Sequence, residues 1–401
     1  MKILVITQYY YPEPFRITDI CEELVNKGNE VTVITGIPNY PDGKIYSGYR
    51  RFKKRKEIVN GVNIIRSFQI ARGKSSIRLF LNYISFMISA SIKVMFKKID
   101  CDLIFVYQLS PVTMMLPAVI AKKKYKRKLF TYSCDLWPDS VKNILKNEKS
   151  IIYKLTDKYS KYLYRKSDRI GVTSESFITY FIDKHDIAKK KLVYIPQHAE
   201  DIYLDIERPT NNGVVDFVFL GNIGKIQDVE NIINAVEIIK QMGKFYVHII
   251  GDGSNFESCV NLTREKKLED RIGFYGRYPL EKTMKFYDVA DICLLTLKNE
   301  SIVGETIPSK LQGYMAAGRP VIAAISGPAK TLIEESKCGT VVKPGDAISL
   351  SKVMAEYILN YEKYLYQGEN GRNYFLRNFT KKLYVDRLIT EFNIMEENEN
   401  V

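Results

Sequence analysis

The sequence of 401 residues has a single tryptophan, three histidines and six cysteines, and the cysteines lie far apart. No C-x-x-C pair occurs and no histidine cluster accompanies a cysteine, so we expect no metal site, no disulfide framework and reduced thiols in a cytosol. The scattered His185, His198 and His248 are expected to serve structure rather than catalysis. We also expect no signal peptide, because the apolar amino-terminal segment has no small-residue cleavage site.

Long apolar runs are also scarce. The longest, Leu79–Phe96, is short for a membrane span. It carries four polar residues at helical spacing: Asn82, Ser85, Ser89 and Lys93. These four lie on one face of a predicted helix over 77–98, so we expect no transmembrane helix. The remaining apolar face can pack in the core or lie at a membrane interface, and we expect the core.

Acidic residues are few in the first half of the chain. Residues 1–200 contain 36 Lys and Arg against 18 Asp and Glu, a net charge of +18, whereas the remainder contains 24 against 28, a net charge of −4. The densest basic runs are RRFKKRK (50–56) and KKKYKRK (122–128). Such a field favours phosphate, nucleic acid or an anionic leaflet, at about 1 kcal/mol per basic side chain near a membrane surface. We favour the lipid surface, with a solvated face as the alternative.

Short β-branched runs alternate with helical periods, which is typical of α/β proteins with parallel sheets. In the first half we predict strands at 3–7, 30–35, 62–66, 103–107, 129–133, 169–173 and 192–195. After a polar stretch, Glu200–Gly213, which we interpret as a hinge, strands are predicted at 216–220, 246–251, 271–275, 292–297, 321–324 and 340–343. The sequence thus predicts two doubly wound, Rossmann-like domains, residues 1–200 and 201–374, facing across a cleft. The helical tail from about residue 375 is expected to pack back on the first domain.

Two glycine turns lie between strand and helix patterns in the second half. FVFLGNIGK places Gly221, Gly224 and Lys225 where free backbone N–H groups and a positive charge suit a diphosphate. A tight turn that needs glycine for packing is the alternative. HIIGDGSN places Gly251 and Gly253 in a second turn, for which a plain turn is the simpler explanation and contact with a nucleotide the other one.

The segment GETIPSKLQGYMAAGRP is the most informative part of the sequence. Ser309 is a good N-cap for the helix that follows, and that helix start would point its dipole into the cleft. Lys310 in the first turn is unfavourable for the dipole unless an anion binds there. The segment therefore indicates a phosphate site.

The order of G-N-I-G-K, G-D-G, R-I-G-F-Y-G-R and T-I-P-S-K-L-Q-x-Y-M-A-A-G-R-P resembles the donor domain of retaining glycosyltransferases of family 4, which have the GT-B fold. YYYPEPFRITDI, YQLSP and CDLWPDS in the first half resemble that family's acceptor domain. The resemblance covers about residues 1–390 and is strongest to the branch with N-acetyl-L-fucosamine transferases of O-antigen and capsule assembly. It implies transfer from a UDP-sugar, without metal or other cofactor, to a polyprenyl-diphosphate-linked saccharide at the inner face of the cell membrane.

The resemblance also implies residue roles. Lys225 and Lys310 would neutralise the diphosphate, helped by backbone N–H groups. Asp135 would contact the sugar or the acceptor hydroxyl, and Glu305 would lie near the sugar ring. Turn capping is the alternative for Asp135, and a solvated loop position is the alternative for Glu305. The expected donor-binding residues are Gly221, Asn222, Gly224, Lys225, Gly251, Gly253, Arg277, Thr306, Pro308, Ser309, Lys310 and Gln312.

Two departures from the family pattern concern the donor. The second of two glutamates, which usually grips the ribose, is replaced by Gly313, so Gln312 or Tyr314 is expected to take its place. The arginine and lysine that usually flank the diphosphate are Asn222 and Gln227.

Three other functions are considered. A nucleotide-sugar epimerase or hydrolase would share the donor loops but would not explain the basic first half. A nicotinamide dehydrogenase would need the G-x-G-x-x-G spacing, which neither glycine turn has. A nucleic-acid-binding protein would explain the charge, but the sequence contains no recognised nucleic-acid module, so we expect no nucleic-acid partner. We expect a cytoplasmic enzyme held peripherally on an anionic membrane surface.

Overall fold

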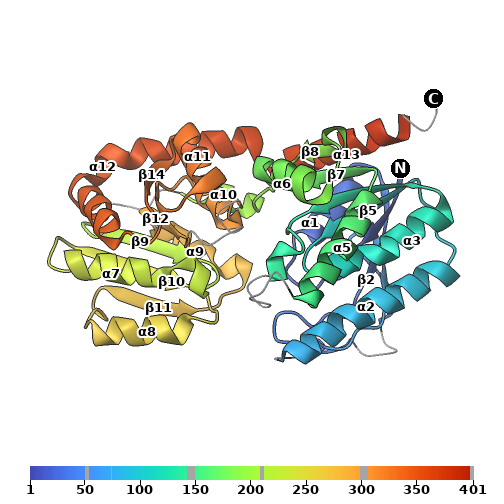
Figure 1. Cartoon of the computed structure of the whole chain (residues 1–401). Helices are drawn as coiled ribbons and strands as arrows, with labels where there is room; N and C mark the ends of the chain where they lie inside the picture. The colour runs from blue at the N-terminus through green and yellow to red at the C-terminus, as the bar shows by residue number, and fades with distance from the viewer. Residues whose placement is uncertain (50–53, 74, 142–149, 208–211, 299–305, 398–401) are drawn as a thin grey trace. The chain divides into compact units, whose positions relative to one another are not determined.

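A computed structural model describes the chain except for residues 50–53, 74, 142–149, 208–211, 299–305 and 398–401. The chain forms two units (Figure 1). The first holds residues 1–195 and the tail from Tyr384, and the second holds residues 196–383. The boundaries predicted from the sequence are residue 200 and a position near residue 375.

The first unit is built on an eight-stranded sheet of order β3-β4-β2-β1-β5-β6-β7-β8. Its strands are β1 (Lys2–Ile6), β2 (Glu30–Thr35), β3 (Lys56–Val59), β4 (Val62–Arg66), β5 (Leu103–Gln108), β6 (Lys128–Ser133), β7 (Arg169–Val172) and β8 (Leu192–Tyr194). All pairs are parallel except β3 with β4. The loops that follow the parallel strands therefore gather at one edge, where α/β sheets bind ligands.

Strand β3 was not predicted. It forms a hairpin with β4, and the turn is Asn60–Gly61, both with positive φ (47° and 79°). An Asn-Gly pair between Val59 and Val62 is a strong hairpin signal, because both turn positions need the left-handed region. No side chain of β3 is buried and the residues before it are basic, so the segment lacks the apolar pattern by which the other strands are predicted.

The helices of the first unit are α1 (Ile17–Asn26), α2 (Ser76–Phe96), α3 (Leu116–Tyr125), α5 (Ile151–Arg165), α6 (Glu175–His185) and α13 (Lys381–Glu397), the last beginning in the second unit. Helix α1 is followed by Gly28, whose φ of +83° suits the left-handed position after a helix. One face of the sheet is covered by α1 and α13, whose Tyr384, Leu388 and Phe392 join its core.

Helix α2 departs from expectation. Among the described residues it is the one helix long and apolar enough to span a membrane by length and composition, and 28% of its apolar window is buried. The expectation that its apolar face packs in the core is wrong, because Ile77, Ile88 and Phe96 are exposed. In Figure 1 it runs beside α3 along the first unit.

The second unit has a fully parallel sheet of order β11-β10-β9-β12-β13-β14. Its strands are β9 (Val215–Leu220), β10 (Phe245–Ile250), β11 (Ile272–Gly276), β12 (Ile292–Thr296), β13 (Val321–Ala324) and β14 (Gly339–Val342). Its helices are α7 (Val229–Ile239), α8 (Phe256–Glu265), α9 (Met284–Val289), α10 (Ser309–Ala316), α11 (Gly327–Ser336) and α12 (Ala347–Asn378).

Alternate side chains of β9 enter two different cores. Phe217 and Phe219 pack with α7 and α8, whereas Val218 packs with α9 and α10. This burial on both faces explains the near-continuous apolar strand patterns. The hinge assigned to Glu200–Gly213 is wrong in its first part, because Tyr203 and Ile206 are buried in the core of the second unit.

Candidate functional site

The loops after β9 and β10 pack against each other through backbone. A Cβ on Gly251 would lie 1.7 Å from the Gly221 carbonyl oxygen, and one on Gly253 would lie 2.4 Å from the Ile223 carbonyl oxygen. The Ile223 N–H donates to the Asp252 carbonyl oxygen at 3.0 Å. The two glycine turns therefore form one structure at the carboxyl edge of the sheet. Gly251 and Gly253 are needed for this packing whether or not they touch a ligand.

The first glycine turn does not lead directly into a long helix. A 3₁₀ turn over Lys225–Gln227 and the left-handed Asp228 come before α7. The Gly224 N–H, expected to face a diphosphate, donates to the Gln227 side-chain oxygen at 3.1 Å, and the Asn222 amide donates to the same oxygen at 3.0 Å. An anion that reaches this turn would have to displace Gln227 from these donors.

Lys310 lies beneath the first glycine turn. Its Nζ is 3.7 Å from the centroid of the Phe219 ring and would be 3.2 Å from a Cβ on Gly221. The ammonium is buried and makes no hydrogen bond with the described part of the chain. Burial lowers the pKa of Lys310 to about 7. A cation held in this way gains most from an anion that enters the site.

The start of α10 differs in detail from the prediction. Pro308 is the N-cap and Ser309 is the first helical residue, so the expected capping by the Ser309 side chain is wrong. The first N–H groups of a helix have no partner within the helix. Those of Ser309 and Lys310 are therefore the backbone donors that α10 offers to an anion.

The side chains of Gln312 and Tyr314 are buried in the second unit. Gln312 is 2% exposed, and its amide nitrogen can donate to the carbonyl oxygens of Pro308 and Ser309. Tyr314 is fully buried, and its hydroxyl accepts from the Leu220 N–H at 3.0 Å. The ribose role offered to Tyr314 is therefore wrong, because its hydroxyl holds the end of β9.

The remaining predicted donor residues differ in how exposed they are. Lys225 and Arg277 are exposed, and Arg277 follows Gly276, whose carbonyl oxygen accepts from the Gly251 N–H at 2.9 Å. Thr306 and Pro308 are half-buried before α10. Glu305, the second predicted catalytic carboxylate, lies outside the described residues.

Asp135 belongs to the first unit, in the loop after β6. The Ser110 and Ser140 hydroxyls donate to its two carboxylate oxygens, one to each. The Trp137 indole N–H donates to Ser110 Oγ at 2.9 Å. These contacts fix the carboxylate orientation, which suits turn capping and a preorganised site equally.

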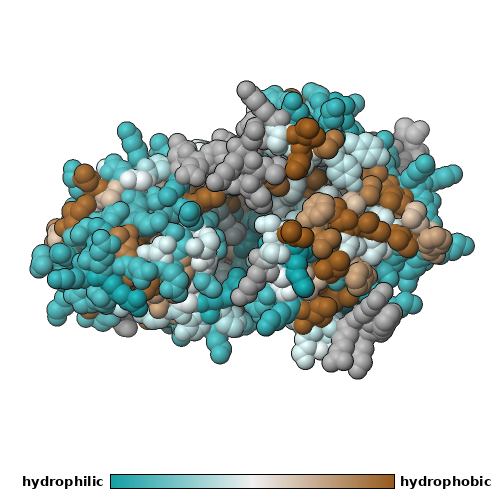
Figure 2. Space-filling view, turned by 60° about the horizontal axis from the view of Figure 1, so that its bottom comes forward, coloured by the Kyte–Doolittle hydropathy of each residue, from teal (hydrophilic) through white to brown (hydrophobic). Residues whose placement is uncertain are grey.

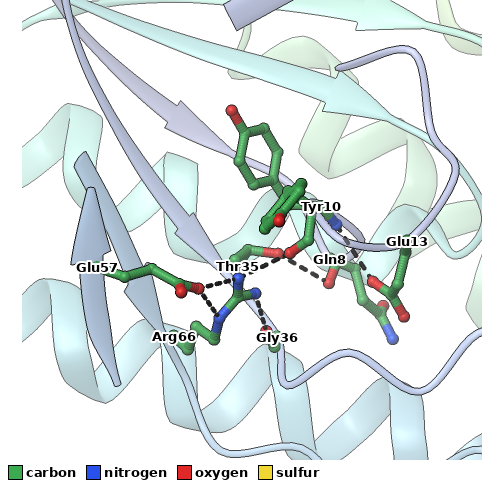
Figure 3. A network of polar contacts seen from close by, with 8 residues as sticks. Gln8, Tyr10, Glu13, Thr35, Gly36, Glu57 and Arg66 are labelled. Atoms are coloured by element: carbon green, nitrogen blue, oxygen red, sulfur yellow. Dashed lines mark hydrogen bonds and ion pairs between the residues drawn. The ribbon is translucent and has the colours of Figure 1, made fainter. Parts of the chain in front are cut away.

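A polar network at the same edge of the first sheet was missed (Figure 3). Arg66, 1% exposed at the end of β4, forms an ion pair with Glu57 and donates to the Gly36 and Tyr11 carbonyl oxygens at 3.4 and 2.7 Å. It thereby ties β3 to the loops after β1 and β2. The signal in the sequence is an arginine that closes a buried strand, where a charge needs several partners.

Glu13 joins the same two loops. Its carboxylate accepts backbone N–H bonds from Asn39 and Tyr40, both 2.8 Å, and from Tyr10 at 3.2 Å. Burial outweighs these donors and raises the pKa of Glu13 to about 7. Figure 3 shows Glu13 beside Tyr10 and apart from the ion pair of Arg66 and Glu57. Glu13 thus fixes the loops after β1 and β2 relative to each other.

The histidines have structural contacts. His185 is fully buried with its Nε2 2.8 Å from the Trp137 carbonyl oxygen, and burial lowers its pKa to about 4. His198 is 1% exposed. His248 lies on β10 with its Nε2 2.8 Å from an Asp216 carboxylate oxygen and its Nδ1 2.9 Å from the Tyr275 hydroxyl.

Comparison with known families decides what these two sheets are. Residues 16–198 match the model of Glycosyltransferase Family 4, and residues 205–374 match that of Glycosyl transferases group 1. The chain is built from two glycosyltransferase domains. The chain is 28% identical over 239 residues to the probable glycosyltransferase WbjE of Pseudomonas aeruginosa, a match that covers 55% of the chain and 58% of WbjE. The chain thus spans less than two thirds of that relative.

A second relative matches over a longer stretch. The putative colanic acid biosynthesis glycosyl transferase WcaI of Escherichia coli is 22% identical over 341 residues, which is 79% of this chain and 82% of WcaI. Among solved structures, HepE of Anabaena in complex with UDP and glucose has a TM-score of 0.69 at 14% identity and covers 98% of this chain and 99% of HepE. The predicted GT-B fold, with two Rossmann-like domains, is confirmed by this likeness.

Proposed function

We propose that this glycosyltransferase moves a sugar from a UDP-sugar to a lipid-linked saccharide in the assembly of a bacterial surface polysaccharide. The observation that carries the proposal is the buried Lys310 ammonium beneath the Gly221 turn, beside the N-terminus of α10. A diphosphate there would meet a cation, backbone N–H groups and the positive end of a helix together. Relatives named for polysaccharide assembly and a UDP-bound structural neighbour support the choice of substrates.

The chemistry assigned to the donor unit is stabilisation of the leaving group. As the bond from the sugar to the diphosphate breaks, negative charge grows on the diphosphate oxygen. A cation and N–H donors fixed beforehand at that oxygen can each contribute roughly 10² to 10³ in rate, by analogy with oxyanion donors. Lys310 is the fixed cation of the proposal, and the exposed Lys225 is a second that can close on the ligand.

The chemistry assigned to the first unit is acceptor orientation. Asp135, held by Ser110 and Ser140, would accept a hydrogen bond from a sugar or acceptor hydroxyl. Retention of configuration, independence of metal and a donor sugar such as N-acetyl-L-fucosamine complete the proposal. These three points depend on the family resemblance.

The proposal is tested by thermal unfolding of the purified chain with UDP, GDP, ADP, dTDP and NAD. A ligand at 100 times its Kd stabilises the native state by about 2.7 kcal/mol, so UDP should raise the Tm clearly. A response to NAD alone would refute the donor site. A UDP response should be followed by transfer assays with UDP-sugars and a polyprenyl-diphosphate-linked saccharide, with and without EDTA. Donor consumption without acceptor would favour a hydrolase or epimerase instead.

A further inference from the structure

Helix α2 is attached to the first unit by its polar side. Asn82 donates to the Ile70 carbonyl oxygen at 2.6 Å and accepts from the Gln8 amide at 2.9 Å. Ser85 Oγ accepts from the Ile70 N–H at 3.0 Å, and Ser89 donates to the Phe68 carbonyl oxygen. Asn82, Ser85 and Ser89, which the spacing places on one face of the helix, therefore face the protein.

The opposite side of α2 is apolar and exposed. Ile77, Leu81, Ile88, Ile92 and Met95 follow one another at helical spacing, and each is more than 40% exposed. Phe96 at the end of the helix is 84% exposed. A surface helix in water normally has the reverse arrangement, with polar residues outward. Exposed aliphatic residues in a continuous stripe indicate a face that another phase or molecule covers.

Helix α5 extends this surface. Its first turn exposes Ile151, Ile152 and Leu155, at 75, 62 and 62%. The two helices touch where the Tyr159 hydroxyl lies 3.6 Å from Met87 Sδ. We call the exposed apolar side chains of α2 and of the first turn of α5 the outer apolar face. Figure 2 shows apolar side chains gathered in a broad patch on the first unit.

Cations lie beside the end of α2. Lys56, Lys97 and Lys98 line a shallow pocket of about 480 Å³, and the half-buried Lys93 is one turn before Lys97. Burial and the cations Arg55, Lys97 and Lys56 lower the pKa of Lys93. Glu57 and Asp100, which also line the pocket, are paired with Arg66 and Lys2. We call Lys56, Lys93, Lys97 and Lys98 the cationic rim.

We propose that the outer apolar face enters the boundary between headgroups and acyl chains of a bilayer, while the cationic rim binds its anionic headgroups. Lysine stems can lie along the apolar side chains and carry their charges to the headgroup level. A second copy of the chain fits less well, because it would bring two cationic rims together. The inference deepens the proposed function and rests on it for its purpose, which is to place the first unit where a lipid-linked acceptor is found.

The test is sedimentation of the full chain with vesicles of phosphatidylcholine, alone or mixed with phosphatidylglycerol. We expect binding to the mixed vesicles. The double variant Ile88→Glu, Ile92→Glu should weaken it at least about thirtyfold, because two half-exposed isoleucines no longer enter the bilayer. Lys97→Gln, Lys98→Gln should weaken it about 25-fold on mixed vesicles only, with little difference at high salt.

The matched control is Ile238→Glu, Ile348→Glu, two isoleucines of the second unit that are 55 and 62% exposed. It should bind vesicles as the unaltered chain does. Circular dichroism and the UDP-induced Tm shift should be unchanged in all variants, which separates loss of membrane binding from failure of the donor site. Equal binding by the Ile88, Ile92 variant and the unaltered chain would overturn the inference. The inference would also be overturned if the chain bound no vesicles and light scattering showed a dimer that the Ile88, Ile92 variant dissociates.

Discussion

Lys310→Met tests whether the buried ammonium belongs to an anion site. A pKa of about 7, against 10.5 for an ordinary lysine, corresponds to about 5 kcal/mol of disfavoured charge. Because the folded-state pKa is depressed, the penalty is full below pH 7 and disappears as the pH rises to about 10.5. We expect the unaltered chain without ligand to gain about 2 kcal/mol of unfolding free energy between pH 7 and 9. Methionine has a similar volume and no charge, so Lys310→Met should be more stable at pH 7 and lack this gain.

The same change should abolish the response to UDP. At pH 8 about nine-tenths of Lys310 is neutral, and a bound diphosphate would charge it, so UDP binding should take up about 0.9 proton. Titration calorimetry in buffers of different ionisation enthalpy measures this uptake. Lys225→Met is the matched control, since Lys225 is exposed in the same region and its loss should weaken binding without raising stability. A Lys310→Met protein that is destabilised yet binds UDP with unchanged proton uptake would refute the reasoning.

Three further changes address the rest of the molecule. Gly251→Ala should lower the free energy of unfolding by more than about 3 kcal/mol and abolish the UDP response, because its Cβ would lie 1.7 Å from the Gly221 carbonyl oxygen. Gly276→Ala, with open space around it, should lower the free energy of unfolding by only about 1 to 2 kcal/mol. Chemical unfolding measures both. The folded-state pKa of His185, about 4, predicts stability that is complete above pH 6.5 and falls by up to about 3 kcal/mol towards pH 4; His185→Phe should lack this loss, and parallel pH profiles would contradict it. Asp135→Asn should lower acceptor-dependent transfer at least about 100-fold while leaving the UDP-induced Tm shift intact, and unchanged transfer would reduce Asp135 to a turn cap.

The sequence was sufficient for the parallel strands because such strands are apolar on both faces. Glu30–Thr35, Val62–Arg66 and Val321–Ala324 have the predicted bounds. Prediction from the sequence failed where one pattern is compatible with two structural arrangements. The stripe of Asn82, Ser85 and Ser89 marks one helical face, but only the contacts with Phe68–Ile70 show that this face is inside.

The site could be located from its glycines but not resolved in detail. The closeness of the two glycine turns and Lys310 follows from parallel strands that end at one edge. That Gln227 occupies the Gly224 N–H, and that Tyr314 holds β9 rather than a ribose, depends on side-chain directions that spacing does not give. The basic run 122–128 was also ambiguous. Lys124 donates to the Val94, Met95 and Lys97 carbonyl oxygens, so part of that charge stabilises the end of α2.

The contribution of α13 to the first unit makes the order of synthesis matter. Tyr384, Leu388 and Phe392 fill a core whose other members come from residues before 196. A ribosome adding about 5 to 20 residues per second needs roughly 10 to 40 s to translate the second unit in between. During that interval the nascent first sheet has an uncovered apolar surface. The first unit therefore completes its core only when the last helix has been made, after the residues that form the core of the second unit.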